Sequence, residues 1–224
     1  MLIVKIMKTP KTPWPTKAAM EQVYKLNLWG SNASEFYSGE GSHNPDLVNP
    51  YIEVIVSFLK TFKTPISVCD LGCGDFNIGS NLYNYASKYF AVDIVPSLID
   101  YNKSNFIANN LSFSCLDIAL DELPSADCAL IRQVLQHLSN KEVKNILQKL
   151  KAYKYVIITE HIPSFDFIPN QDIISGQGIR LKKQSGLDVL KAPFNFKITS
   201  QEALLTINLK EGKGKIVTTK YTLQ

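Results

Sequence analysis

Short apolar runs alternate with amphipathic segments through the middle of the chain. Five of these runs have the length of buried strands, at residues 66–71, 89–94, 111–116, 126–132 and 153–160. The segments between them predict helices at residues 77–87, 96–109 and 140–151. Strands that alternate with helices in this way predict a parallel sheet with helices on both of its faces.

The two ends of the chain break this alternation. Near the carboxyl end, residues 203–209 and 215–223 flank a glycine-containing turn and predict an antiparallel hairpin. The segment 162–200 before the hairpin has no regular pattern, and loops of that length in compact domains are often functional. Near the amino end, two predicted helices flank a polar loop at residues 31–43 that contains glycines.

The predicted fold is therefore an α/β domain with a doubly wound, mostly parallel, seven-stranded sheet that includes a C-terminal antiparallel hairpin. The helices predicted at residues 17–28 and 45–64 form an N-terminal helical cap before this domain. Residues 1–64, which hold the cap and its glycine loop, are thus expected to differ in organisation from residues 65–224.

Composition agrees with a soluble globular domain, because 45% of the 224 residues are hydrophobic and 20% are charged. No apolar run approaches the roughly 18 residues of a membrane-spanning helix. The four cysteines lie in or beside apolar runs without CxxC spacing. We therefore expect reduced thiols in a cytoplasmic protein, with no membrane contact and no metal site.

The formal net charge of +4 is unevenly distributed. Residues 180–220 carry nine basic side chains against three acidic ones, so the rest of the chain has a small acidic excess. This pattern leaves two interpretations open, a solvated surface on the last strands or a site for an acidic acceptor molecule. A mild excess of this kind argues against a nucleic-acid partner.

The strongest local motif joins the first predicted strand to the next segment, at Val68–Phe76. The strand ends near Asp70, and Gly72 and Gly74 allow the backbone to approach a ligand closely. Two more acidic residues end the following strands, Asp93 and Asp117. In doubly wound folds, ligands bind at this edge, and an acidic residue after the second strand hydrogen-bonds the ribose of an adenosine-containing ligand.

Together, the run Val68–Phe76, the two later aspartates and the fourth strand Cys128–Arg132 resemble a class I S-adenosylmethionine-dependent methyltransferase. The resemblance covers about residues 65–224, including the terminal hairpin, and implies that S-adenosyl-L-methionine is the cofactor. Because long loops in compact domains are often functional, the insert 162–200 is expected to cover the site of the methyl acceptor. The cofactor-binding positions that it implies are Asp70, Gly72, Cys73, Gly74, Asp93, Ile94, Asp117, Ile118, Arg132 and Gln133.

An acceptor with an O–H or N–H group must lose a proton, which a histidine can take near neutral pH. His161 at the end of the fifth strand and His137 after the fourth are therefore candidate catalytic residues. His43, Tyr37 and Arg180 are candidate acceptor-binding residues. A purely structural role remains open for each of them, as does catalysis without any protein base.

The expected function is transfer of a methyl group from S-adenosylmethionine to a small-molecule acceptor by in-line displacement. Two alternatives remain, a non-catalytic S-adenosylmethionine-binding module and an NAD-dependent oxidoreductase. The oxidoreductase is disfavoured because Asn77 replaces the third glycine of the dinucleotide motif and because the chain ends in a hairpin. The sequence assigns neither the methylated atom nor the oligomeric state.

Overall fold

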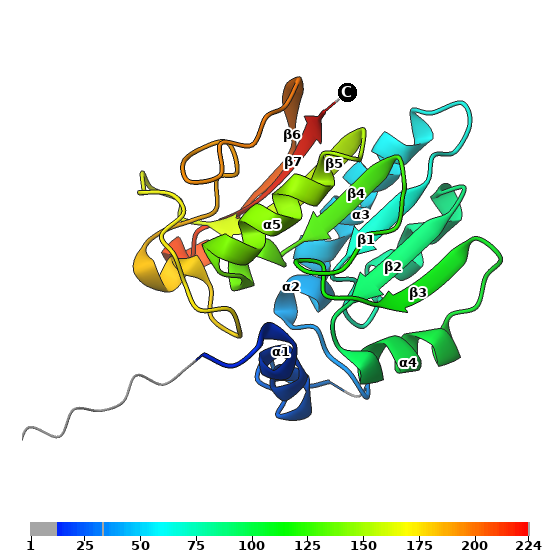
Figure 1. The fold of residues 1–224 in the computed structure, drawn as a ribbon, viewed down its shortest axis with the longest axis horizontal. Helices are drawn as coiled ribbons and strands as arrows, with labels where there is room; N and C mark the ends of the chain where they lie inside the picture. The colour runs from blue at the N-terminus through cyan, green and yellow to red at the C-terminus, as the bar shows by residue number, and fades with distance from the viewer. Residues whose placement is uncertain (1–12, 33, 224) are drawn as a thin grey trace, which may run out of the picture.

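A computed structural model describes residues 13–32 and 34–223. Within these residues, seven strands form one sheet in the order β3-β2-β1-β4-β5-β7-β6 (Figure 1). The strands are β1 (Val68–Leu71), β2 (Tyr89–Asp93), β3 (Leu111–Cys115), β4 (Cys128–Arg132), β5 (Tyr155–Ile162), β6 (Ser200–Asn208) and β7 (Lys215–Thr222). Strands β1 to β5 are parallel, whereas β7 pairs antiparallel with both β5 and β6. The doubly wound sheet and its terminal hairpin are therefore confirmed.

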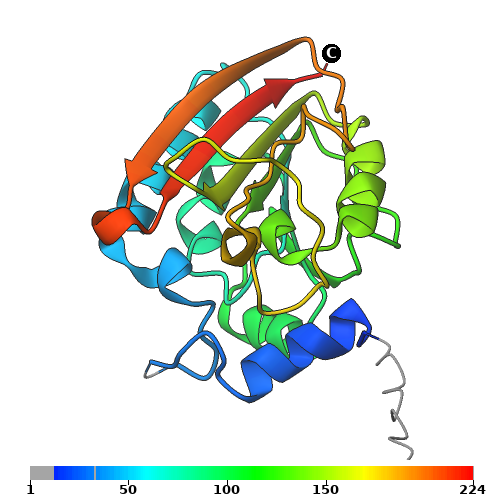
Figure 2. The same cartoon turned by 90° about the vertical axis from the view of Figure 1, so that its left-hand side faces the viewer.

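The α-helices of the described residues are α1 (Thr16–Lys25), α2 (Glu40–His43), α3 (Pro45–Lys60), α4 (Pro96–Asn105) and α5 (Asn140–Leu150). Their starts follow from local sequence. The Asn44 side chain caps α3 by accepting from the Asp46 N–H, and Ser139 and Glu142 form a reciprocal capping box at α5. Helix α1 lies across the edge at which the parallel strands end (Figures 1 and 2).

Two hydrophobic clusters form the core, and β1 contributes to both. Cys69 and Leu71 belong to the cluster that contains the apolar side of α5, whereas Val68 belongs to the cluster of α3. Alternate side chains of a strand point to opposite faces of a sheet, so β1 is covered by helices on both sides. All of these β1 side chains are fully buried.

The helix predicted at residues 77–87 is wrong. The segment forms two short 3₁₀ turns instead, Gly79–Asn81 and Tyr83–Tyr85. Phe76 is fully buried with a left-handed backbone, and Gly79 lies so close to its ring that a Cβ there would overlap the ring. The segment is rich in weak helix formers such as Gly, Ser and Asn. The packing of Phe76 therefore decides its conformation, and no α-helix forms there.

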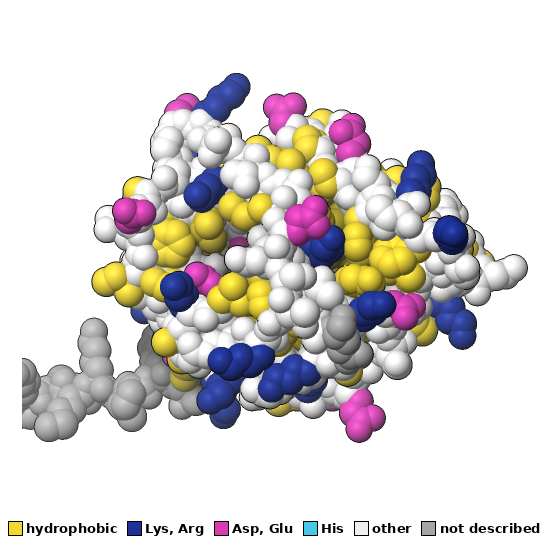
Figure 3. Space-filling view, turned by 90° about the horizontal axis from the view of Figure 1, so that it is seen from above, with side chains coloured by type: hydrophobic (Ala, Val, Ile, Leu, Met, Phe, Trp, Pro, Cys, Tyr) yellow, Lys and Arg dark blue, Asp and Glu magenta, His cyan; other side chains and the backbone are white. Residues whose placement is uncertain are grey.

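The proposed boundary near residue 64 stays a prediction. Helix α3 precedes it in sequence, yet Ile55 and Leu59 of this helix pack in the same cluster as Val68 of β1. In the part of the chain that the structure describes, no helix has the length and apolar character needed to cross a membrane. The face in Figure 3 shows basic and acidic side chains among exposed apolar ones.

Candidate functional site

A cavity of about 390 Å³ lies at the edge where β1, β2 and β4 end. Helix α1, residues 38–42 and the insert 162–200 supply its other walls. All ten residues predicted to bind the cofactor line this cavity: Asp70, Gly72, Cys73, Gly74, Asp93, Ile94, Asp117, Ile118, Arg132 and Gln133. The structure thus brings together positions that are up to 63 residues apart in the sequence.

The glycine turn at the cavity has a backbone that requires glycine. Gly72 and Gly74 have φ angles of 87° and 57°, and a Cβ on Gly72 would overlap the side chain of Val134. The Gly74 N–H donates to Asp93 Oδ2 at 3.0 Å, and the Asn102 side chain donates to the Gly74 carbonyl at 2.7 Å. The turn is therefore fixed by hydrogen bonds on both sides of Gly74.

Two buried carboxylates face the cavity from neighbouring strands. Burial raises the pKa of Asp93, although the N–H groups of Val95 and Gly74 stabilise its ionised form. Burial also raises the pKa of Asp70 to about 7, against the opposing effect of a 2.9 Å hydrogen bond from the Tyr89 hydroxyl. Each carboxylate is less than 9% exposed.

Arg132 at the end of β4 brings a positive charge to the same cavity. Its Nη2 donates to the Gly41 carbonyl at 2.5 Å, and its Nη1 donates to Gln133 Oε1 at 3.2 Å. The guanidinium lies 4.9 Å from the centre of the Tyr51 ring. Burial lowers the pKa of Arg132.

The cavity is nevertheless mainly acidic. Of its described lining residues, five are acidic (Glu40, Asp70, Asp93, Asp117 and Glu142) and two are lysine or arginine (Arg132 and Lys182). Walls of low polarity strengthen such a field, so the cavity favours a ligand that carries positive charge.

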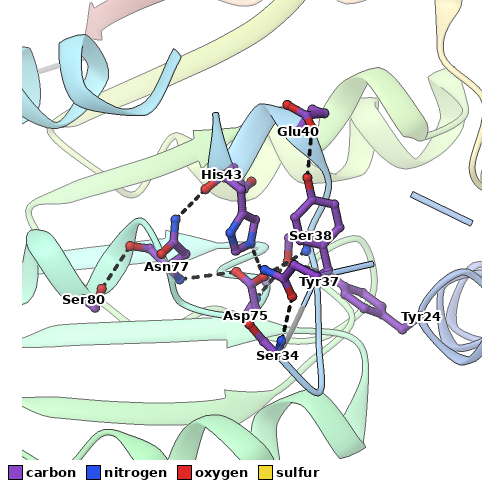
Figure 4. A network of polar contacts seen from close by, with 12 residues as sticks. Tyr24, Ser34, Tyr37, Ser38, Glu40, His43, Asp75, Asn77 and Ser80 are labelled. Carbon is purple, nitrogen blue, oxygen red and sulfur yellow. Dashed lines mark hydrogen bonds and ion pairs between the residues drawn. The ribbon is translucent and has the colours of Figure 1, made fainter. Parts of the chain in front are cut away.

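Residues 34–43, here called the lid segment, are fastened over the glycine turn (Figure 4). Asp75 holds them through two of its atoms. Its Oδ2 accepts from the Ser38 N–H at 2.9 Å and lies 2.6 Å from His43 Nε2, while its own N–H donates to Ser38 Oγ at 2.9 Å. The Asn77 side chain adds a 2.6 Å hydrogen bond to the Ser42 carbonyl. The lid segment therefore closes one side of the cavity.

Comparison with known proteins agrees with this geometry. Residues 68–153 match the family model described as a methyltransferase domain. Residues 68–153 therefore carry a methyltransferase domain. The predicted resemblance of this chain to methyltransferases is thereby confirmed.

The methyltransferase domain has a curated relative in Rickettsia bellii (strain OSU 85-389), a ubiquinone biosynthesis O-methyltransferase. The two are 26% identical over 121 residues, which cover 52% of this chain and 50% of the relative. The chain thus spans about half the length of the curated relatives it matches first.

Solved structures share the fold of this methyltransferase domain. The N-methyltransferase NodS from Bradyrhizobium japonicum WM9, in complex with S-adenosyl-L-homocysteine, aligns with a TM-score of 0.67 at 10% identity, over 91% of this chain and 98% of NodS. The magnesium protoporphyrin IX methyltransferase from Synechocystis PCC 6803, with bound S-adenosylhomocysteine, aligns with a TM-score of 0.58 at 13% identity, over 93% of this chain and all of that chain.

Of the two candidate catalytic histidines, only His137 lines the cavity. Its Nδ1 lies 3.2 Å from the Gly176 carbonyl and its Nε2 lies 3.3 Å from the Gln136 amide nitrogen. Burial lowers its pKa to about 4, so the imidazole is neutral at physiological pH. His161 is outside the lining, and its Nε2 lies 2.6 Å from the Lys213 carbonyl in the turn before β7.

The three candidate acceptor-binding residues also lie outside the cavity lining. Arg180 is 1% exposed, and it donates to the carbonyls of Leu135 and Leu138 and to the Asn140 side chain. Its guanidinium is therefore occupied by the protein itself, because the insert folds back over the turn after β4. His43 and Tyr37 belong to the lid segment, where their ring centres lie 4.4 Å apart.

Several residues of the methyltransferase domain's cavity were not predicted. Tyr51 lines it from α3, although its spacing in the sequence indicated only the apolar side of a helix. Trp29 lines it after α1. Asp75 was also missed, because nothing in its local sequence separates a lid-binding carboxylate from an ordinary turn residue.

Proposed function

We propose that the methyltransferase domain transfers a methyl group from S-adenosyl-L-methionine to a small-molecule acceptor. The observation that carries this proposal is the acidic cavity at the strand ends, where Asp70, Asp93 and Asp117 converge beside the glycine turn. The volume of about 390 Å³ is in the range of small-molecule sites. The family match and the curated O-methyltransferase relative support the same reaction class.

The residues of the cavity fit this cofactor in three places. The buried carboxylate of Asp93, held by two backbone N–H groups, suits the ribose hydroxyls. Asp117 and Ile118 supply a polar and an apolar wall for the adenine ring. When bound, the cofactor supplies a methyl group that its sulfonium charge activates towards a nucleophile.

The chain itself contributes binding, orientation and exclusion of water. The lid segment and α1 cover the cavity, and Tyr24 of α1 joins them through a 2.9 Å contact between its hydroxyl and Ser38 Oγ. A covered cavity that holds the cofactor and the acceptor in line removes much of the entropic cost of the displacement.

We propose that no histidine takes a proton from the acceptor. All three histidines of the chain lie in the described part. His161 and His43 are both outside the cavity lining. His137 has both ring nitrogens near protein groups and a pKa of about 4. The acceptor therefore enters as a competent nucleophile or gives its proton to solvent.

Trp29, Glu40, Gln177 and Lys182 line the cavity outside the predicted cofactor-binding positions, so we infer that they face the acceptor. A site between an aromatic ring, an amide and charges of both signs suits a small, partly polar molecule. The role of the curated relative in ubiquinone biosynthesis supports a small-molecule acceptor. Release of S-adenosylhomocysteine from S-adenosylmethionine, measured with panels of phenols, carboxylic acids and amines, identifies the class.

Calorimetry with S-adenosylhomocysteine and with NAD tests the cofactor assignment. We expect the wild-type protein to bind S-adenosylhomocysteine and not NAD. Asp93→Ala should weaken that binding by about tenfold or more, because it removes a charged acceptor from the cavity. Asp100→Ala, on the exposed side of α4, is the matched control and should leave the affinity unchanged. Binding of NAD alone, or an Asp93→Ala variant with wild-type affinity, contradicts the proposal.

A further inference from the structure

Two rings that line the cavity, those of Trp29 and His137, contact each other. Their centres lie 5.2 Å apart, with an angle of 48° between the ring planes. Tyr24, which also lines the cavity, meets the Trp29 ring edge-on with 5.5 Å between the two centres. Tyr24, Trp29 and His137, here called the aromatic row, therefore form a continuous series of rings. None of them belongs to the predicted cofactor-binding positions.

The hydrogen bonds around His137 define the neutral form of its ring. The His161 N–H donates to Gln136 Oε1 at 3.0 Å, which fixes the orientation of the Gln136 amide. The amide nitrogen of Gln136 therefore donates to His137 Nε2, at 3.3 Å. We assign the ring hydrogen to Nδ1, which donates to the Gly176 carbonyl at 3.2 Å. Since both nitrogens are occupied, only the carbon atoms and the π faces of the ring are left for a ligand.

The insert holds the backbone at both of these rings. The Gly176 N–H donates to the His137 carbonyl at 3.0 Å, in addition to the contact of Gly176 with the ring. The Gln177 side chain donates to the carbonyl of Leu28, the residue before Trp29, at 2.7 Å. Two consecutive residues of the insert thus join the end of α1 to the turn after β4. Rings that are held in place before a ligand binds cost less entropy when it does.

We propose that the aromatic row is a stacking surface that selects a flat aromatic methyl acceptor, with Trp29 and His137 as specificity-determining residues. The inference rests on the proposed function and deepens it by naming the class of the acceptor. Contacts between aromatic rings raise affinity by about two- to tenfold beyond the effect of the apolar area that is buried. His137 serves this acceptor as an aromatic surface and not as a base.

Two pairs of probes isolate the ring in the wild-type protein saturated with S-adenosylhomocysteine. The pairs are 2-phenylethylamine with 2-cyclohexylethylamine, and 3-phenylpropanoate with 3-cyclohexylpropanoate, so each pair keeps its polar group and differs only in the ring. Cyclohexyl is the more apolar ring, so a merely apolar cavity favours it, whereas a stacking surface favours phenyl. We expect calorimetry to show about two- to tenfold tighter binding of the phenyl probe in at least one pair. If neither phenyl probe binds more tightly than its cyclohexyl partner, or if no probe binds, the inference is overturned.

Variants of His137 separate stacking from hydrogen bonding. His137→Phe keeps a flat ring and removes both nitrogens, so it should retain the preference for phenyl over cyclohexyl. His137→Gln keeps polar atoms and removes the ring, so the ratio of the two affinities should fall towards one. His161→Gln, outside the cavity lining, is the matched control and should keep the wild-type ratio. The reverse order, with the preference kept by His137→Gln and lost by His137→Phe, overturns the stacking role.

The two tryptophans of the chain supply a second matched pair of variants. Trp29→Leu replaces a ring of the aromatic row with an aliphatic side chain and should remove most of the preference for phenyl. Trp14→Leu, at a position that is 58% exposed and outside the cavity lining, should leave the preference unchanged. The same preference in both variants overturns the role of Trp29. This comparison leaves His137 intact, so it decides the question even if the His137 variants do not fold.

Titration with S-adenosylhomocysteine alone keeps the two proposals apart. If the wild-type protein binds it but prefers neither phenyl probe, the stacking surface fails and the proposed function stands. If the wild-type protein does not bind it, the proposed function fails and the stacking surface fails with it. Each variant is also melted and titrated with S-adenosylhomocysteine. A uniform loss of affinity for S-adenosylhomocysteine and all four probes identifies a structural role and overturns the assignment.

Discussion

At the scale of single residues, the carboxyl group of Glu160 has an unusual pKa because it is buried in the core. It lies in β5, is 5% exposed, and burial raises its pKa to about 8, against the opposing charge of Arg180. The folded protein therefore binds this proton more tightly than the unfolded chain does. Ionisation of Glu160 then costs stability progressively as the pH rises from about 4.5 towards 8.

Glu160→Gln removes this titration with little change in volume. We expect the stability of the variant relative to the wild type to increase across that pH range and to level off above about 8. Urea denaturation from pH 5 to pH 9 measures the difference. The control Glu53→Gln, on the exposed side of α3, should show no such trend. A difference between Glu160→Gln and wild type that is independent of pH contradicts the expectation.

At the scale of elements, Arg180 fastens the insert to the turn that follows β4. Its guanidinium donates to Leu135 and Leu138 carbonyls at 2.9 and 2.7 Å and to the Asn140 side chain at 2.7 Å. The 3₁₀ turn Leu135–His137 forms one wall of the cavity. Arg180 does not line the cavity itself. Through Arg180, the insert therefore holds the turn that forms this wall.

Arg180→Met keeps an apolar stem and leaves these acceptors without their donor. We expect a loss of about 2–4 kcal/mol in the free energy of unfolding, because buried acceptors lose a charged partner. Denaturant titration measures this loss. Lys182→Ala, on the exposed side of the same turn, is the matched control and should change stability by less than about 0.5 kcal/mol. A similar stability for both variants contradicts the anchoring role.

At the scale of the whole molecule, the lid segment joins the amino-terminal part of the chain to the glycine turn. The network in Figure 4 centres on Asp75, which contacts both Ser38 and His43. These contacts join segments that are distant in the sequence, since Ser38 and Asp75 are 37 residues apart. Their loss should open the cavity on the side of the lid segment without changing the strand ends that line it.

Asp75→Asn keeps the shape of the side chain and removes its charge and one acceptor. We expect S-adenosylhomocysteine to dissociate several-fold to about tenfold faster, because the lid segment is held by fewer hydrogen bonds. Trp29 lines the cavity, and its fluorescence in a Trp14→Phe background reports release in stopped flow. Asp46→Asn, exposed at the start of α3, is the control. Unchanged release from Asp75→Asn contradicts the role of the network.

The sequence by itself determined much of the fold and the strand ends that line the cavity. Apolar runs of strand length gave the sheet, because alternate faces of a strand must be buried and helices must cover them. The ten predicted cofactor-binding positions all line the cavity, because the carboxyl ends of parallel strands meet at one edge. Such positions depend only on local pattern and on the regular geometry of the sheet.

Only the tertiary structure decided how the other chemical groups are used. Arg180 is buried as an anchor, His161 contacts the Lys213 carbonyl, and Asp75 holds the lid segment. Each of these roles depends on partners far away in the sequence, which no local pattern specifies. Arg132 is the clearest case. The sequence placed it at the strand end, and the packing brought the Gly41 carbonyl and the Tyr51 ring to its guanidinium.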